Sequence, residues 1–218
     1  MIGIGQPGLF SYEPAYADEL EVIMRWGFDY MQAKDGGSVY LRLSTKVIDQ
    51  PKRKISQTIE KHIIKGAYWH TPPIQGAKVA IVYSGAVVPE VLEAYEQLRE
   101  EIPELGVLAI TSSDKLFHEW HSSQTDHPKG EKFSDCHILE LIRPLHSDAV
   151  LITVQDAHPA NLSWIGSASG RKLLTLGVTE FGQSGNIPDL YRSYGIDSDA
   201  IIDATARASL ASAASLTS

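Results

Sequence analysis

Two apolar runs in this chain limit the folds that it can adopt. Residues 79–82 read Val-Ala-Ile-Val, and residues 150–154 read Val-Leu-Ile-Thr-Val. Neither run alternates between apolar and polar side chains, as a strand with one face in water does. Strands that are apolar throughout are covered on both faces, because the helices that connect parallel strands pack on both sides of the sheet. The runs therefore predict an α/β fold of three layers, α/β/α, with a mostly parallel sheet.

Strands and helices are expected to alternate along the rest of the chain. Tyr16, Leu20 and Ile23 begin an apolar stripe at helical spacing, and Asp35-Gly36-Gly37 ends that helix. A short helix is expected around Ile59 within a polar connection. Strands are expected at residues 39–44, 78–84, 107–111, 149–154 and 173–178. Further helices are expected at residues 88–101, 114–121, 134–143, 160–168, 187–194 and about 197–210.

Residues 173–197 combine a short strand, a glycine-rich loop and a helix in the sequence LLTLGVTEFGQSGNIPDLYRSYGID. Pro188 stands where a helix commonly begins, and Ser184 or Asn186 is expected to cap it. The loop is expected to leave the end of a central strand. Phe181 should then turn inward and pack, while Gln183 points outward.

This segment and four others resemble the transketolase superfamily, and within it the homodimeric E1 components of pyruvate dehydrogenase complexes. The others are Ser11–Met24, Val39–Leu43, Ile59–Tyr68 and Thr111–Leu116. The resemblance implies a domain like the transketolase C-terminal domain at residues 76–218. It also implies a linker at residues 51–75. A helix-strand remnant at the end of a pyrimidine-binding domain would occupy residues 1–50.

The resemblance also implies a reaction, the thiamine-diphosphate-dependent decarboxylation of a 2-oxo acid and acyl transfer to a lipoyl group. Members of the family hold Mg²⁺ and the diphosphate with a Gly-Asp-Gly…Asn-Asn segment, which this sequence lacks. Their cofactor-activating Glu lies upstream of the helix expected from residue 14, so it too is missing from this sequence. Their His after the strand at 39–44 is also missing, since residues 45–51 read TKVIDQP. No catalytic, cofactor-binding or metal residue is therefore assigned, and the chain is not expected to be active alone.

Partners follow from the same resemblance. Thiamine diphosphate and Mg²⁺ belong to the full-length family, so the chain is expected to need the remainder of an E1 chain or a partner subunit. Its own role would be scaffolding and subunit contact within an acetyl-transferring E1-like oxidoreductase, as a homo-oligomer in the cytoplasm. Two alternatives stay open: a fragment of a transketolase-like sugar-phosphate enzyme, and a non-catalytic anion-binding or assembly module.

One edge of the predicted sheet gathers the candidate site residues. Ligands of open parallel sheets collect outside the carboxyl ends of the strands. The polar residues expected at this rim are Ser84, Ser112, Ser113, Asp156, His158, Gln183 and Ser184. The competing interpretation is that they cap helices and satisfy the loop backbone.

Three other patterns are interpreted as structural. The G-x-G-x-x-G sequence at Gly3–Gly8 has no preceding strand, so it does not predict a dinucleotide site. The triplet Lys52-Arg53-Lys54 is expected to be a solvated part of the linker. The sequence His118-Glu119-Trp120-His121, followed by Asp126 and His127, is expected to be solvated rather than to bind metal.

Composition excludes further classes of function. The net charge of −8 disfavours nucleic-acid binding, which needs clustered Lys and Arg. No apolar run reaches the roughly 18 residues that span a bilayer, so no membrane role is expected. The single cysteine, Cys136, has no internal disulfide partner, which suits the cytoplasm.

Overall fold

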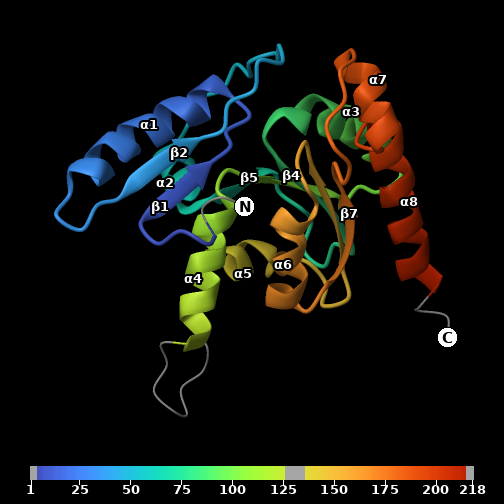
Figure 1. Cartoon of the computed structure of the whole chain (residues 1–218). Helices are drawn as coiled ribbons and strands as arrows, with labels where there is room; N and C mark the ends of the chain where they lie inside the picture. Colours follow the sequence, from blue (N-terminus) through green and yellow to red (C-terminus); the bar gives the residue numbers. More distant parts are fainter. Residues whose placement is uncertain (1–3, 126–135, 215–218) are drawn as a thin grey trace. The chain divides into compact units, whose positions relative to one another are not determined.

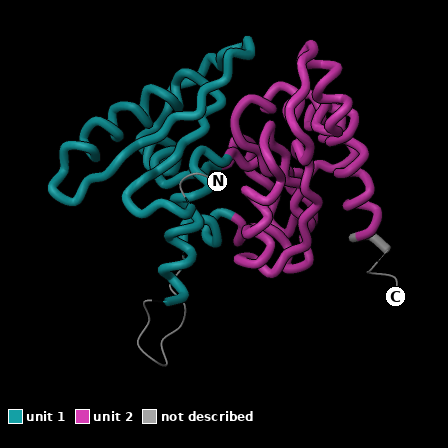
Figure 2. Tube along the Cα trace, viewed as in Figure 1, with its two compact units in different colours: residues 1–68, 110–141 teal, residues 69–109, 142–218 magenta. Residues whose placement is uncertain are grey.

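The computed structural model of the chain describes residues 4–125 and 136–214 (Figure 1). The chain forms two compact units (Figure 2). Unit 1 comprises residues 1–68 and 110–141, and unit 2 comprises residues 69–109 and 142–218. The three-part division of the chain at residues 50 and 75 remains a prediction.

A five-stranded sheet in the order β3-β5-β4-β6-β7 organises unit 2. Its strands are β3 (Ala67–Thr71), β4 (Val79–Ser84), β5 (Gly106–Ile110), β6 (Val150–Gln155) and β7 (Lys172–Leu176). β6 pairs in parallel with β4 and with β7. Every residue of β4 and β6 is buried, as their unbroken apolar runs predicted.

Helices cover both faces of this sheet, which confirms the predicted three layers. The helices of unit 2 are α3 (Val88–Leu98), α6 (Ala160–Ser169), α7 (Ile187–Tyr194) and α8 (Ser198–Ala214), with a short 3-10 turn at Gly85–Val87. α8 packs on β4 and β6, α6 packs on β7, and Figure 1 shows α6 and α8 on opposite sides of β7. The fold is therefore α/β with a mostly parallel sheet between helical layers.

The predicted helix after the glycine-rich loop forms with the expected cap. The Oδ1 atom of Asn186 accepts a hydrogen bond from the backbone N–H of Asp189 at 2.9 Å. Pro188 lies in the first turn, and Gly195, with φ 64°, closes the helix in the left-handed region that favours glycine.

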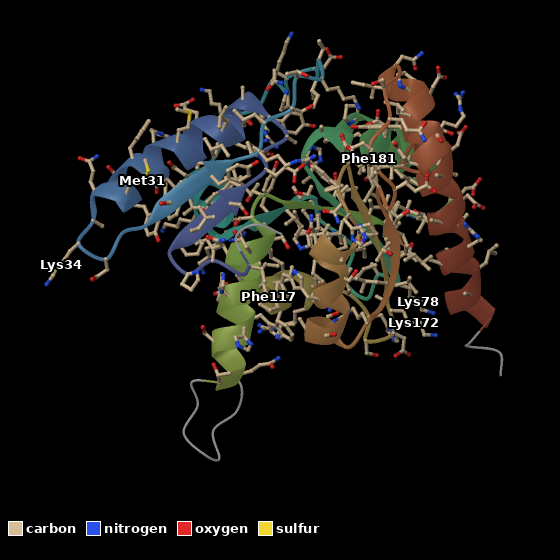
Figure 3. The ribbon with its side chains drawn as sticks, in the orientation of Figure 1. Met31, Lys34, Lys78, Phe117, Lys172 and Phe181 are labelled. Atoms are coloured by element: carbon tan, nitrogen blue, oxygen red, sulfur yellow. The ribbon has the colours of Figure 1, made fainter. Side chains whose placement is uncertain are left out.

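The prediction for Phe181 is wrong, because the side chain is 95% exposed (Figure 3). β7 is an edge strand of the sheet rather than a central one. The loop that follows an edge strand has neighbouring structure on one side only, and residues 179–189 are exposed throughout. An inward turn would therefore find no apolar surface to cover the ring.

We expect Phe181→Ala to change the free energy of unfolding by less than about 0.5 kcal/mol, because an exposed ring loses little on truncation. Gln183→Ala should behave alike. Ile152→Ala in the buried strand β6 serves as the control and should cost about 2–5 kcal/mol. Urea denaturation of the three variants measures these differences, and a Phe181→Ala loss close to that of Ile152→Ala would contradict the exposed position.

Unit 1 contains a second, smaller sheet of two strands. β1 (Leu9–Tyr12) pairs in parallel with β2 (Ser38–Leu41), and α1 (Ala17–Gln32) connects them. As part of a helix-strand remnant, the strand predicted at 39–44 would be expected to have unpaired edges. β1, which was not predicted, instead pairs with it along one edge within the chain. The remaining helices of unit 1 are α2 (Gln57–Lys65), α4 (Ser113–Thr125) and α5 (His137–Ile142). The first residues of the helix predicted at 134–143 lie outside the described residues.

Candidate functional site

The carboxyl ends of β4, β6 and β7 lie at one edge of the sheet in unit 2. Ser84 ends β4 and is buried, and it lies opposite Gln155, which ends β6. Gln155 is also buried, and its Nε2 atom donates a hydrogen bond to the carbonyl oxygen of His158 at 2.8 Å. Gln155 was not among the predicted rim residues, but its hydrogen bond stabilises the turn that contains Asp156 and His158.

Asp156 and His158 follow β6 at the same edge, and both contact neighbouring helices. The Tyr191 hydroxyl of α7 donates to Oδ2 of Asp156 at 3.1 Å. The backbone N–H of Ala160, at the start of α6, donates to Nδ1 of the exposed His158 at 3.2 Å. Both hydrogen bonds are of the kind expected if the rim residues have a structural role, in which polar side chains bond to helix ends and loops.

The last two rim residues of unit 2 lie on the exposed loop between β7 and α7. The backbone N–H of Gln183 donates to the Tyr194 hydroxyl at 3.1 Å, and the side chains of Gln183 and Ser184 are exposed. The remaining predicted residues, Ser112 and Ser113, belong to unit 1. A ligand-binding role for the rim stays a prediction.

Ser112 and Ser113 lie at the start of α4, next to the buried carboxylate of Asp114. The hydroxyl of Ser112 donates to Oδ1 of Asp114 at 2.7 Å. The N–H and the hydroxyl of Ser11 both donate to Oδ2 of Asp114, at 2.8 and 2.7 Å. Asp114 therefore joins β1 to the first turn of α4, where the helix dipole also favours a negative charge.

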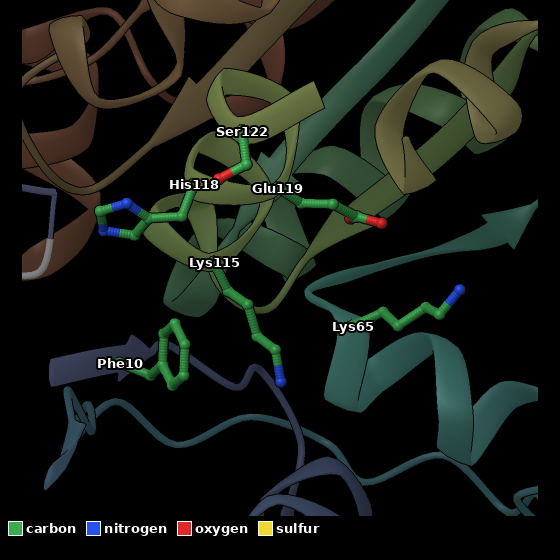
Figure 4. A pocket seen from close by; sticks show the side chains of 6 residues that line it. All are labelled: Phe10, Lys65, Lys115, His118, Glu119 and Ser122. Carbon is green, nitrogen blue, oxygen red and sulfur yellow. The ribbon is translucent and has the colours of Figure 1, made fainter. Parts of the chain in front are cut away.

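A pocket of about 310 Å³ lies in unit 1 beside this junction (Figure 4). Residues from β1, from the end of α2 and from α4 line it: Phe10, Lys65, Lys115, His118, Glu119 and Ser122. Figure 4 shows the side chains of Phe10 and Lys115 next to each other, while those of Lys65 and His118 point away from them. Two lysines and a histidine against one carboxylate make the lining suited to a small anionic molecule.

Aromatic rings surround the ammonium group of Lys115. Its Nζ atom lies 3.9 Å from the ring centroid of Trp26 and 5.1 Å from that of Phe10. Nζ also donates to the Tyr12 hydroxyl at 3.2 Å. Burial lowers the pKa of Lys115 to about 8, although Glu119 and Asp114 act to raise it. The Tyr12 hydroxyl stays protonated, because burial raises its pKa.

A second buried carboxylate, Glu19, lies in the first turn of α1. Its Oε2 atom accepts hydrogen bonds from the N–H groups of Ala15 and Tyr16, at 2.7 and 3.2 Å. Its Oε1 atom accepts a short hydrogen bond from the Tyr68 hydroxyl and a longer one, 3.4 Å, from Arg53. Burial raises the pKa of Glu19, against the hydrogen bonds from Tyr68, Ala15 and Tyr16, which lower it.

Arg53 also corrects the expectation that the basic triplet is solvated. Its guanidinium donates to both carboxylate oxygens of Asp18, at 2.8 and 3.0 Å, and its side chain is only 23% exposed. Lys52 and Lys54 are exposed as expected. The difference has a simple cause: α1 brings two acidic residues of its first turn to the linker, and only the middle residue of the triplet faces them.

A buried histidine connects α5 to the start of β3. Nε2 of His137 lies 2.8 Å from the carbonyl oxygen of Ala67 and must carry the proton there. The ring of His62 packs edge-on against it, with centroids 4.8 Å apart. Burial, together with His62 and Lys65, lowers the pKa of His137 to about 4, although the bond to Ala67 and the charge of Glu140 act to raise it.

We expect stability to fall on acidification because of His137. Its folded pKa lies below the unfolded value near 6.5, so the unfolded state binds more protons between about pH 6.5 and pH 4. The free energy of unfolding should therefore be about 2 kcal/mol lower at pH 5 than at pH 7.5 from this group alone. His137→Gln should reduce the difference in unfolding free energy between the two pH values, as measured by urea denaturation at each. An unchanged pH dependence in that variant would show that His137 is not its source.

Lys115, Asp114, Glu19, Arg53 and His137 were all missed as candidates by sequence reasoning. Only two of them carry a local signal: Glu19 stands at the third position of a helix after a polar start, and Asp114 opens a helix after two serines. The partners of Lys115 and Arg53 lie 89 and 35 residues away, at Trp26 and Asp18. No local pattern reports such pairings.

The residues of the described part of the chain do not fit a Mg²⁺–diphosphate cofactor. Within that part, no three His, Cys, Asp or Glu residues cluster as metal ligands. His118 lines the pocket, His121 stacks on Phe117, and Asp126 and His127 lie outside the described residues. The carboxylates of Glu19 and Asp114 are already engaged by protein donors. None of the helices within residues 4–125 and 136–214 could span a membrane.

Comparison with known protein families gives a match over residues 66–197 to the family described as "Transketolase-like TK C-terminal domain". Among curated proteins, the pyruvate dehydrogenase E1 component of Mycolicibacterium smegmatis is 26% identical over 209 residues. That of Escherichia coli K12 is 25% identical over 214 residues. In both cases the match covers 90% of this chain and 22% of the relative, so the chain spans about a fifth of the length of these relatives.

Solved structures show the same fold. Transketolase from Leishmania mexicana aligns with a TM-score of 0.66 and 16% identity, covering 94% of this chain and 26% of that one. A structure described as "Split gene transketolase, inactive beta4 tetramer" aligns with a TM-score of 0.64 and 17% identity. Here the alignment covers 95% of this chain and 60% of the other.

Proposed function

Since this chain belongs to the family of transketolase-like C-terminal domains, we propose that it is the C-terminal part of a thiamine-diphosphate-dependent pyruvate dehydrogenase E1-like enzyme. Its role there is to scaffold the enzyme and to form subunit contacts, in the cytoplasm, without a complete active site of its own. Pyruvate dehydrogenase E1 components are the curated relatives that match most of its length.

The small sheet of unit 1 is the observation that carries this proposal. Parallel strands occur almost only in larger sheets that are covered on both faces, and two strands alone are marginal in water. β1 and β2 form such a pair, so among the described residues each has one sheet neighbour. Its outer edges can accept further strands, as unpaired edges commonly do.

Large apolar side chains of α1 and of the segment around β2 are also exposed. On α1, Met24, Phe28 and Met31 are 40%, 53% and 46% exposed, and Tyr40 and Leu43 on or after β2 are 40% and 55% exposed. Large apolar side chains gathered on one element mark an interaction surface. The rest of an E1 chain, or a partner subunit, would cover them by extending the sheet of β1 and β2.

Recovery of the protein from its native cells tests the proposal. We expect an antibody against this chain to recover it within a longer polypeptide, or with a second one, that carries a Gly-Asp-Gly…Asn-Asn segment. The recovered assembly should decarboxylate pyruvate when given thiamine diphosphate and Mg²⁺. Recovery of a lone chain with no such companion, or an assembly inactive on pyruvate, would overturn it.

The choice of substrate separates the proposal from its enzyme alternative. The structural relatives are transketolases, so a transketolase-like activity on sugar phosphates is the second candidate for the assembled enzyme. Activity on ketose phosphates in place of pyruvate would favour it. A lone chain that binds small anions at the strand-end rim would favour the non-catalytic module.

We expect the isolated chain to bind no thiamine diphosphate. The buried carboxylates of Glu19 and Asp114 are held by protein donors, and the Gly-Asp-Gly and Asn-Asn sequences are absent. Isothermal titration with thiamine diphosphate and Mg²⁺ measures this directly, with the recovered assembly as the positive control. A micromolar dissociation constant for the isolated chain would contradict the expectation.

A further inference from the structure

Lys115 is placed unlike an ordinary surface lysine. The side chain leaves α4 and ends among the rings of Phe10, Tyr12 and Trp26, with Nζ 5.1, 5.9 and 3.9 Å from their centroids. Its hydrogen-bond partner is the neutral hydroxyl of Tyr12. Within the described part of the chain no carboxylate forms an ion pair with it at contact distance, and Asp114 is turned toward Ser11 and Ser112, although the charges of Glu119 and Asp114 act on the ammonium group from further away.

The same lysine lines a pocket that a small molecule can enter. The pocket, about 310 Å³, is at the lower end of the range for small ligands. Phe10 supplies an apolar wall next to Lys115. Lys65 and His118 also belong to the lining, and their side chains point to opposite sides of the view (Figure 4). An anionic group on a ligand could be met by one of these two side chains while the rest of the ligand faces Phe10.

A lysine that has lost part of its hydration in an apolar site is an activated amine. Only the unprotonated amine is a nucleophile. With the pKa of Lys115 lowered by burial to about 8, roughly a quarter of the amine is neutral at pH 7.5, against about one part in a thousand for an ordinary lysine.

We propose that Lys115 is a carbonyl-reactive residue, which forms an imine with a small aldehyde carrying an anionic group. The lone pair of Nζ attacks the carbonyl carbon and forms the C–N bond of a carbinolamine. The carbonyl oxygen then leaves as water with the two protons of the neutral amine, and the C=N bond forms. The step needs no oxidant or reductant, and the Tyr12 hydroxyl holds Nζ in position at the pocket wall.

Pyridoxal 5′-phosphate is the probe for this proposal, because it joins an aldehyde to a phosphate. The whole chain is incubated with it near pH 7.5 and reduced with borohydride, and the labelled peptides are identified by mass spectrometry. We expect Lys115 to be labelled at least about tenfold faster than Lys65 in the same pocket or the exposed Lys61 on α2. Lys115→Arg keeps a cation over Trp26 and should abolish the fast labelling, while Lys61→Arg should leave it intact.

Two further measurements use the chain without substitutions, so they test the proposal even if a variant folds poorly. The labelling rate should rise with pH and level off above about pH 8, and a rate that still climbs near pH 10 would overturn the proposal. Pyridoxal without its phosphate should label Lys115 more slowly, and excess inorganic phosphate should slow the phosphorylated probe. Equal rates for both probes would overturn the anionic part of the proposal, and equal labelling of all three lysines would overturn the whole of it.

Discussion

Gly66→Ala should lower the free energy of unfolding by about 2–5 kcal/mol, the largest single loss that we expect in unit 1. Gly66 ends α2 with φ 113°, a backbone conformation that side chains resist. An added Cβ atom would lie 2.7 Å from the carbonyl oxygen of Ser112 and 2.9 Å from Cγ of Leu116. The backbone oxygen cannot move easily, because the carbonyl of Gly66 itself accepts from the N–H groups of Thr111 and Ser112.

The structure offers a matched control for this prediction. Gly170 ends α6 with φ 66°, and an added Cβ atom there would meet nothing within 4 Å. Gly170→Ala therefore isolates the cost of the left-handed backbone, about 1–2 kcal/mol. Chemical denaturation of both variants gives, by difference, the added cost of the close contacts and of the wider φ at Gly66. Equal losses of unfolding free energy for the two substitutions would contradict the close approach of Gly66 to Ser112 and Leu116.

Glu19→Ala should destabilise the protein by about 3 kcal/mol, because it leaves buried donors without an acceptor. Glu19 is 1% exposed, and four donors reach its carboxylate: the N–H groups of Ala15 and Tyr16, the Tyr68 hydroxyl and Arg53. The backbone donors lie directly before α1, where Tyr16 is the N-cap residue, so the loss of the Glu19 carboxylate also weakens the start of that helix.

Glu19→Gln distinguishes the role of shape from that of charge. The amide oxygen can still accept from the two backbone N–H groups, and the neutral side chain avoids burying a charge, which is the effect that raises the pKa of Glu19. We expect a loss of less than about 1.5 kcal/mol, measured by urea denaturation near pH 7. Equal losses for the alanine and glutamine variants would show that the negative charge, through Arg53, matters more than the helix cap.

The local sequence determined the central part of the fold. The runs at 79–82 and 150–154 are buried strands, because their apolar side chains leave no face for water. The helix at Ile187–Tyr194 begins and ends where Asn186, Pro188 and Gly195 place it, because these residues act on the backbone within one turn. The resemblance carried by five short segments agrees with the family that matches residues 66–197.

The tertiary structure alone decided the order of the strands and the long-range contacts. Phe181 is exposed because β7 lies at the edge of the sheet, and the residues of a strand do not by themselves predict its place in the strand order. β1 and β3 are four and five residues long, too short for a periodic pattern to stand out. Arg53 forms hydrogen bonds with Asp18, 35 residues away in the sequence, and Lys115 lies over the ring of Trp26, 89 residues away. Local sequence fixes which face of an element is apolar, but the partner of a polar side chain depends on which elements the folded chain brings beside it.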